Sequence, residues 1–389
     1  MSDWQQIIKD QSIATLEKLA DKFGHDVIDV EALKPAFDNF QMRITPAALE
    51  QIKEVGDPMW NQYIPTVEEL HVVDGVIDSL DEDGDSPVPN ITHRYPDRAL
   101  FLVSPVCATY CRFCTRRRKV GDPEKIPLNQ YDSAFQYLRE HTEIRDVIMS
   151  GGDPMMLSDR RLEYLFQQLR AIPHIEIIRI GSRITSHLPE RITPEFCEMV
   201  QKYHPIFMNT HFNHPSELTP AAVAALDRLS KAGISLGCQT VLLKGVNDDP
   251  KVMMKLMHEL LKARVRPYYI FMADQVAGGE HFRTTVQKGL EIIQALRGWT
   301  SGLAVPQFVI DSPGGGGKVP LLPEYVESIT DDEVVFRNYE GKRYVYKQPH
   351  PAPAEPAELE PAAEVGIVPI SRKKTATPRR SKRRRAAGE

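Results

Sequence analysis

Between residues 98 and 311, short apolar runs alternate with segments in which apolar residues recur every three or four positions. The short runs predict buried strands, and the segments between them predict amphipathic helices. The predicted strands are 99–104, 146–150, 175–181, 206–210, 234–243, 265–271 and 306–310. The predicted helices are 159–171, 194–203, 220–232, 251–263 and 286–296. Strand and helix alternating at about thirty residues favour parallel βαβ units, and hence an α/β fold.

A barrel and an open doubly wound sheet both satisfy this alternation. The unusual polar and glycine-rich clusters of the chain each follow a predicted strand. Barrel enzymes place their chemistry at the carboxyl ends of the strands. We therefore favour a partial (β/α) barrel similar to a TIM barrel.

The N-terminal part predicts a small helical layer. Apolar residues are at helical spacing in 3–24, 30–40 and 45–55, and Gly24 is a helix stop. An acidic stretch follows, and its aspartates at 81, 83 and 85 suggest a calcium loop. Such a loop needs a glycine where Ser86 stands and a closing glutamate, so we interpret the stretch as a solvated linker.

The C-terminal part changes character twice. Residues 333–347 alternate around a turn at 338–341, which predicts a β-hairpin. Residues 350–389 are rich in Pro, Ala and Glu and then in Arg and Lys, so a disordered basic tail is expected. A solvated extension with an unknown partner is favoured over one that contacts nucleic acid. The expected domains are 1–85, 86–330, 331–349 and 350–389.

Composition restricts the class of protein. The 389 residues are 42% hydrophobic, which suits a sizeable core, and the net charge of −5 argues against a polyanionic partner for the whole chain. The first residues lack the apolar core of a secretion signal, and no apolar run reaches the length of a membrane span. The five cysteines fit a reducing compartment, so a cytoplasmic protein without a membrane partner is expected.

Cys107, Cys111 and Cys114 fall within eight residues. Thiolates at this C-x3-C-x2-C spacing can hold three corners of a [4Fe–4S] cluster and leave the fourth iron open to another ligand. A zinc knot is the alternative, but structural zinc requires four ligands, and the nearest histidine, His93, lies upstream. His211 and His214 are also possible metal ligands, although without a third ligand a polar loop is favoured.

Two glycine-rich segments follow predicted strands. Residues 150–153 form Ser-Gly-Gly-Asp, which is typical either of a tight turn or of close backbone approach to a ligand. Four glycines precede Lys318, but a P-loop is excluded because Ser312 and Val319 stand at two of its required positions. A lysine on such a loop can form a Schiff base with pyridoxal 5′-phosphate (PLP), or the loop is simply mobile.

Three motifs in the same order resemble the lysine 2,3-aminomutase family of radical S-adenosylmethionine (SAM) enzymes. They are the cysteine triplet with its basic extension 115–119, the segment 93–98, and the glycine loop that ends at Lys318. The resemblance covers about residues 85–323. It implies a partial barrel of radical SAM type and an isomerase that interconverts L-lysine and L-β-lysine through a 5′-deoxyadenosyl radical. Its cofactors would be a [4Fe–4S] cluster, SAM and PLP.

The resemblance also implies a role for each matching residue. The three cysteines would bind the cluster, Lys318 would be catalytic and hold PLP, and Arg116 would bind the substrate carboxylate. Asp274 and Asp311 would receive the distal ammonium of lysine, an acidic pair that would repel glutamate. The SAM contacts would be Phe113, Ser150, Gly151, Gly152 and Asp153. The PLP contacts would be Arg94, Tyr95, Arg98, Gln239 and Lys318.

The partners implied by the resemblance are an amino acid substrate, an electron donor such as flavodoxin or ferredoxin, and further copies of the chain in a homo-oligomer. Family members can carry C-terminal cysteines that bind zinc, whereas this chain has none after Cys238. Two alternatives stay open. One is an aminomutase for another cationic amino acid such as arginine, and the other is a nucleic-acid-associated iron–sulfur protein that works through the basic tail.

Overall fold

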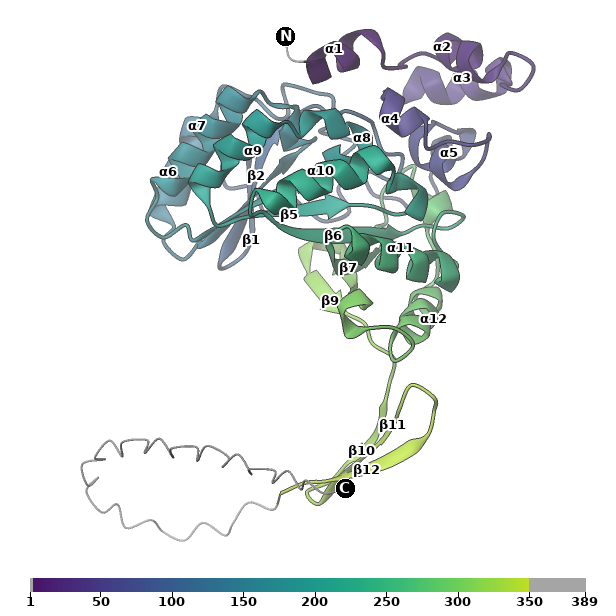
Figure 1. Ribbon diagram of the computed structural model, residues 1–389, viewed down its shortest axis with the longest axis vertical. Helices are drawn as coiled ribbons and strands as arrows, with labels where there is room; N and C mark the ends of the chain where they lie inside the picture. The colour runs from purple at the N-terminus through teal and green to yellow at the C-terminus, as the bar shows by residue number, and fades with distance from the viewer. Residues whose placement is uncertain (1–2, 350–389) are drawn as a thin grey trace, which may run out of the picture. The chain divides into compact units, whose positions relative to one another are not determined.

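The computed structural model describes residues 3–349, and in that part the main sheet has nine strands in the order β1 to β9 (Figure 1). Strands β2 to β8 are parallel, and β1 and β9 are antiparallel edges. The strands are β1 (Ile91–Tyr95), β2 (Arg98–Ser104), β3 (Asp146–Gly151), β4 (Ile177–Ser182), β5 (Ile206–His211), β6 (Ser235–Leu242), β7 (Arg266–Met272), β8 (Gln307–Ser312) and β9 (Gly317–Pro320). A doubly wound sheet would reverse its strand order at a switch point. The sequential order therefore confirms the partial barrel.

Helices connect the parallel strands, and in Figure 1 α7, α9 and α10 lie beside one another outside the sheet. The helices are α6 (Tyr131–Glu140), α7 (Asp159–Arg170), α8 (Ile184–His187), α9 (Pro194–Val200), α10 (Pro220–Lys231), α11 (Pro250–Lys262) and α12 (Val286–Leu296). The predicted strands and helices are confirmed with shifts of a few residues at their ends. The sequence analysis missed α6 and the two edge strands β1 and β9.

The strands separate an outer apolar face from a hollow interior, because their side chains alternate between the two. In β4, Ile178 and Ile180 are buried in the core under the helices, whereas Arg179 and Gly181 line the interior. Gly237 of β6 also faces inward. Bulky branched residues usually fill a barrel of this type. Here glycines at inward positions leave space for a cavity.

The N-terminal layer of the described residues has five helices, of which the last four form an apolar cluster of their own, whereas Trp4 of the first is buried in the core of the barrel. The five helices are α1 (Asp3–Asp10), α2 (Leu16–Phe23), α3 (Val30–Asn39), α4 (Pro46–Leu49) and α5 (Pro58–Tyr63). The helical pattern in 3–24 is divided between two helices, and Gly24 ends the second with φ 103°. The expectation of a helix over 45–55 is wrong beyond Leu49. The side chain of Asp57 instead accepts hydrogen bonds from the backbone of Met59 and Trp60 and begins α5.

This N-terminal layer contacts the loop that carries the cysteines. The amide of Arg112 donates to the carbonyl of Gln62 at 2.9 Å, and the amide of Tyr110 donates to Arg43 at 3.1 Å. The guanidinium of Arg112 pairs with the buried carboxylate of Glu69 at 2.8 Å. Removing one partner of such a buried ion pair destabilises the fold strongly, because the other charge stays buried without compensation. The helical layer therefore supports the conformation of the cysteine loop.

A second compact unit begins after residue 325 and contains a three-stranded sheet. Its strands are β10 (Val326–Ile329), β11 (Glu333–Arg337) and β12 (Arg343–Lys347). The predicted hairpin is confirmed by β11 and β12, and β10 was missed. The expected basic tail at 350–389 lies outside the described residues, and the boundaries at 85 and 330 stay predictions. None of the described helices has both the length and the apolar character needed to cross a bilayer.

Candidate active site

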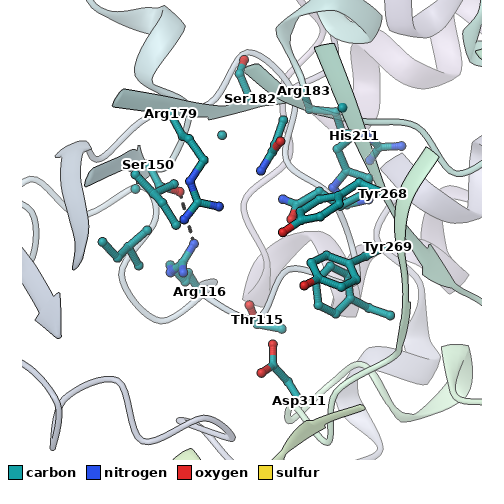
Figure 2. Close-up of a pocket in the computed structure, with 18 of the residues that line it drawn as sticks. Thr115, Arg116, Ser150, Arg179, Ser182, Arg183, His211, Tyr268, Tyr269 and Asp311 are labelled. Carbon is teal, nitrogen blue, oxygen red and sulfur yellow. Dashed lines mark hydrogen bonds between the residues drawn. The ribbon is translucent and has the colours of Figure 1, made fainter. Parts of the chain in front are cut away.

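One cavity of about 980 Å³ occupies the hollow of the barrel (Figure 2). All of the residues to which the family resemblance assigns a role line it. They are Arg94, Tyr95, Arg98, Cys107, Cys111, Phe113, Cys114, Arg116, Ser150, Gly151, Gly152, Asp153, Gln239, Asp274, Asp311 and Lys318. The cysteine triplet and the lysine of the glycine loop, far apart in sequence, therefore face the same space. Ligand-binding cavities commonly have this volume.

The glycine segment after β3 supports the start of the cysteine loop. The amide of Gly152 donates to the carbonyl of Ser104 at 2.6 Å, and the amide of Asp153 donates to Val106 at 2.8 Å. A Cβ on Gly152 would lie 2.5 Å from the carbonyl oxygen of Val106. The carboxylate of Asp153 accepts from the hydroxyl of Ser182 at 2.7 Å. Close approach of the chain's own backbone thus requires glycine here.

The three thiols suit a cluster better than a single ion. Burial raises the pKa of Cys107 and of Cys114, and the neighbouring charges of Asp153 and Cys111 raise them further, so the site needs a cationic partner before it holds thiolates. Among the described residues, no three His, Cys, Asp or Glu side chains converge on one metal-ion position. Zinc would draw thiolates together on one ion, whereas each cysteine of an iron–sulfur cube binds a different iron.

Arg183 is a site residue that the sequence analysis missed. It follows β4, its Nη1 donates to the Sγ of Cys111 at 2.9 Å, and its Nη2 pairs with the buried carboxylate of Glu217 at 2.8 Å. Its guanidinium also lies 5.3 Å from the centre of the Phe113 ring. Burial alone lowers its pKa, but Cys111 and Glu217 raise it above the usual value. An arginine directly after a predicted strand was the signal available in the sequence.

His211 and His214 each contact a neighbouring polar side chain. His211 lies at the end of β5 in the cavity, and its Nε2 is 2.9 Å from the side-chain oxygen of Asn213. Burial and the charge of Arg183 lower its pKa to about 3, so the imidazole is neutral at physiological pH. His214 instead contacts Ser216 and caps a short turn. The preference for ordinary polar roles agrees with these contacts.

The part of the cavity that contains Lys318, here called the lysine end, lies where the edge strands β1 and β9 approach each other. The Nζ of Lys318 on β9 is 2.9 Å from Asp311 on β8, and the amide of Lys318 donates to the hydroxyl of Tyr95 at 2.9 Å. The guanidinium of Arg98 covers the ring of Tyr95 at 3.8 Å. In the described residues β1 and β9 are not paired as strands. The hydroxyl of Tyr95 thus connects the two edges of the barrel.

Asp274, in the loop after β7, has an unusual protonation equilibrium. Burial and, to a smaller extent, the neighbouring carboxylate of Asp311 together raise its pKa to about 7, against the opposing effect of the cations Lys318 and Arg116. Two carboxylates that share a poorly hydrated region are stabilised by an added cation. This end of the cavity therefore favours a ligand with an ammonium or guanidinium group.

Arg116 has a partner that the sequence analysis did not expect. Its Nε donates to Glu82 at 2.8 Å and its Nη1 to the hydroxyl of Ser150 at 3.4 Å, the latter drawn in Figure 2. Glu82 is only 6% exposed and lines the cavity. The interpretation of the acidic stretch as a solvated linker is therefore wrong. Its acids pair with Arg116, Arg118, Lys119 and Arg94.

Three cysteines at C-x3-C-x2-C spacing after the first parallel strand of a partial barrel would hold a [4Fe–4S] cluster with one corner open to another ligand, which is typical of the class of radical SAM proteins. In agreement, residues 101–257 match the family model of the Radical SAM superfamily. That class uses a [4Fe–4S] cluster and SAM. Residues 293–377 match the family model described as Lysine-2,3-aminomutase. Together with the relatives below, these matches show that the chain belongs to the lysine 2,3-aminomutase family, a family of isomerases.

Curated relatives cover most of the chain. An L-lysine 2,3-aminomutase from Fusobacterium nucleatum is 49% identical over 91% of this chain and 84% of its own length. One from Clostridium subterminale is 48% identical over 90% and 84%. A glutamate 2,3-aminomutase from Clostridioides difficile is 45% identical over 80% and 75%. Streptococcus suis SuiB, a solved structure, is 13% identical over 56% of this chain and 50% of its own, with a TM-score of 0.41.

Proposed function

We propose that this chain is an L-lysine 2,3-aminomutase that interconverts L-lysine and L-β-lysine. The observation that carries the proposal is the pair Asp274 and Asp311 beside Lys318, in the cavity that also contains Arg116. A substrate with one carboxylate and one distal ammonium matches these charges. The second carboxylate of glutamate would be repelled by the acidic pair. The identities of 49% and 45% are too close to make this distinction on their own.

The residues present fit the cofactors of the proposal. The three cysteines would hold the cluster, and Phe113 with residues 150–153 would contact SAM. Lys318 would hold PLP, with Tyr95 and Gln239 beside it and the arginines at 94 and 98 suited to its phosphate. When bound, the cluster and SAM supply a 5′-deoxyadenosyl radical, and PLP supplies the conjugated system that lets the amino group move from C2 to C3.

Lys318 and Asp311 prepare the amine end of the reaction. The Nζ of Lys318 is 2.9 Å from a carboxylate oxygen of Asp311, so an ion pair holds the amine in the cavity before it reacts. Asp311 is also one of the two carboxylates that we propose for binding the ammonium group of the substrate, so in the ligand-free protein Lys318 occupies that position. Once Lys318 is covalently engaged, Asp311 is free to bind that ammonium.

The walls of the cavity restrict water and orient the substrate. Phe113, which lines the cavity, is only 8% exposed, and each of the strands β3 to β7 contributes residues to the wall. Arg116 at one place and the Asp274–Asp311 pair at another bind opposite ends of an extended amino acid. Fixing both ends holds the reacting carbons in one orientation and lowers the entropic barrier. A confined site also limits side reactions of a reactive radical.

The test uses protein reconstituted under argon with iron, sulfide and PLP. Labelled L-lysine, SAM and dithionite are added, and the products are separated by chromatography. We expect L-β-lysine, no turnover of glutamate, and borohydride trapping of PLP on Lys318. Turnover of arginine in place of lysine would identify the alternative cationic substrate. A protein that binds PLP but isomerises none of these amino acids would contradict the proposal.

A further inference from the structure

Residues 74–85, here called the acidic strap, cross the rim of the cavity without forming a helix or a strand. The segment contains six acidic residues and no Lys or Arg. Its Val76 bonds to the loop that follows Asp274, because the amide of Val76 donates to the carbonyl of Gln275 at 2.8 Å. The amide of Gly314, in the glycine loop, donates to the carbonyl of Ser79 at 3.0 Å. The strap thus touches both loops at the lysine end of the site.

The strap is held by charge on its other side. Asp78 pairs with Arg118, Asp83 pairs with Lys119, and Asp85 accepts from the Nε of Arg94 at 2.6 Å. The side chains of these partners are only 10–14% exposed, and Arg94 also lines the cavity. Among the acids of the strap, only Glu82 lines the cavity. It is therefore the one acidic group of the segment in position to act on a bound ligand.

Glu82 binds one edge of the Arg116 guanidinium, and the other edge faces the cavity. Its Oε1 lies 2.8 Å from Nε and 2.7 Å from Nη2, and its Oε2 lies 3.1 Å from Nε. The third nitrogen, Nη1, has one hydrogen bond among the described residues, to Ser150 at 3.4 Å (Figure 2). A planar guanidinium offers its donors in a fixed fork, so fixing one edge determines where the other points.

We infer that Glu82 is a positioning residue that acts through Arg116 and aims the free edge of the guanidinium at the substrate carboxylate. The inference rests on the proposed function, which assigns that carboxylate to Arg116. Without Glu82, the nearby carboxylates Asp274 and Asp311 are the groups that attract Arg116. Arg116 would then occupy the place of the substrate ammonium, and both ends of the substrate would lose their partners.

The test compares two ligands that differ in the carboxylate alone. The holoenzyme, with its cluster oxidised so that no turnover occurs, is titrated calorimetrically under argon with L-lysine and with 1,5-diaminopentane. We expect Glu82→Gln to weaken L-lysine binding roughly tenfold, the effect of losing about one charge-assisted hydrogen bond. An amide replaces one acceptor by a donor, so it cannot hold the same edge of Arg116. Binding of the diamine should change by less than about twofold.

Asp83→Asn is the matched control, because it makes the same charge change one residue away at a side chain that is 64% exposed. The affinity for L-lysine and the affinity for 1,5-diaminopentane should both be unchanged in this variant. In an Arg116→Lys background the additional effect of Glu82→Gln should vanish, since the residue through which it acts is gone. Glu82→Asp keeps the charge but has a shorter side chain. It should weaken binding of L-lysine and not of the diamine, by less than Glu82→Gln does. This variant replaces Glu82→Gln in the test if the glutamine variant does not fold.

The outcomes separate the inference from the proposed function. Equal weakening of both ligands, tighter binding of L-lysine, or an effect that persists without Arg116 would each overturn the positioning role. A wild-type enzyme that isomerises lysine while Glu82→Gln binds it normally overturns the inference alone. A wild-type protein that neither binds nor isomerises lysine overturns the proposed function and this inference with it.

Discussion

At the scale of single residues, Asp274 illustrates how the cavity selects charge. Its carboxyl group has a pKa of about 7 because burial disfavours the anion and Asp311 adds a second negative charge. The usual value for an aspartate is about 3.9. The proton is therefore held more tightly in the folded protein than in the unfolded chain. A cationic ligand compensates the same unfavourable charge and should displace that proton.

Lysine affinity should consequently depend on pH. As pH rises from about 6 to about 8.5, Asp274 loses its proton and the dissociation constant of L-lysine should fall, because the carboxylate attracts the ammonium. Asp274→Asn should remove this pH dependence and weaken binding at the upper end roughly tenfold. Calorimetric titration across the pH range measures both effects. A dissociation constant that is flat with pH in the wild type would contradict the role of Asp274.

The same pKa shift predicts a change in stability of the ligand-free protein. Between about pH 4 and about pH 7 the folded state binds more protons than the unfolded state, so the stability contributed by this group declines as pH rises. Asp274→Asn should therefore melt higher than the wild type at pH 8 and almost equally at pH 4. Thermal melts at the two pH values test the sign. A lower melting temperature of the variant at pH 8 would show that Asp274 stabilises the fold as an anion.

At the scale of elements, the end of β3 and the cysteine loop act as one unit. Gly151 has φ 128°, and a Cβ on Gly152 would collide with the backbone of Val106, just before Cys107. The requirement for glycine thus comes from packing between two chain segments. Loss of either contact would move the first cluster ligand.

Gly152→Ala should lower stability by about 1–3 kcal/mol through overpacking and reduce the iron bound after reconstitution. The backbone of Val106 must shift to admit the methyl group, and Cys107 moves with it. Iron analysis and thermal melts measure the two effects. Gly302→Ala is the control, since its Cβ would meet no described atom within 4 Å. A Gly152→Ala protein with a full cluster and unchanged melting would refute the proposed coupling.

At the scale of the whole molecule, the candidate site lies within one of the two compact units. The residues that bind the proposed ligands extend from Glu82 to Lys318, whereas the second unit begins after residue 325. The barrel, the N-terminal layer and the strap therefore suffice to build the cavity.

Ending the chain after residue 349 should leave lysine turnover within about twofold of the full-length rate, because every described residue that lines the cavity is kept. The measurement is the initial rate of β-lysine formation with equal cluster and PLP content in the two proteins. Loss of turnover on truncation, or nucleic-acid binding by the full-length protein that disappears with the tail, would favour the nucleic-acid-associated iron–sulfur protein instead.

The sequence by itself determined the features that depend on local patterns. Buried strands and amphipathic helices follow from the spacing of apolar residues, which is why α12 matches its predicted limits. Cluster ligands can be recognised because three thiols on one short loop are constrained by the chain itself. Lys318 was selected as a candidate by the glycines next to it together with the resemblance of three motifs to a known family. Edge strands such as β1 gave little signal, since only one neighbour fixes their pattern.

Only the tertiary structure decided which distant residues meet. Arg116 pairs with Glu82 34 positions away, Arg183 donates to Cys111 across 72 positions, and Lys318 bonds to Tyr95 across 223. A single charged or hydroxyl side chain is not part of a periodic pattern, so the sequence alone does not indicate which residue it will contact. The partner is fixed when parallel strands bring their carboxyl ends to one rim and the acidic strap closes over it. Burial at that rim then changes the charge that these groups carry.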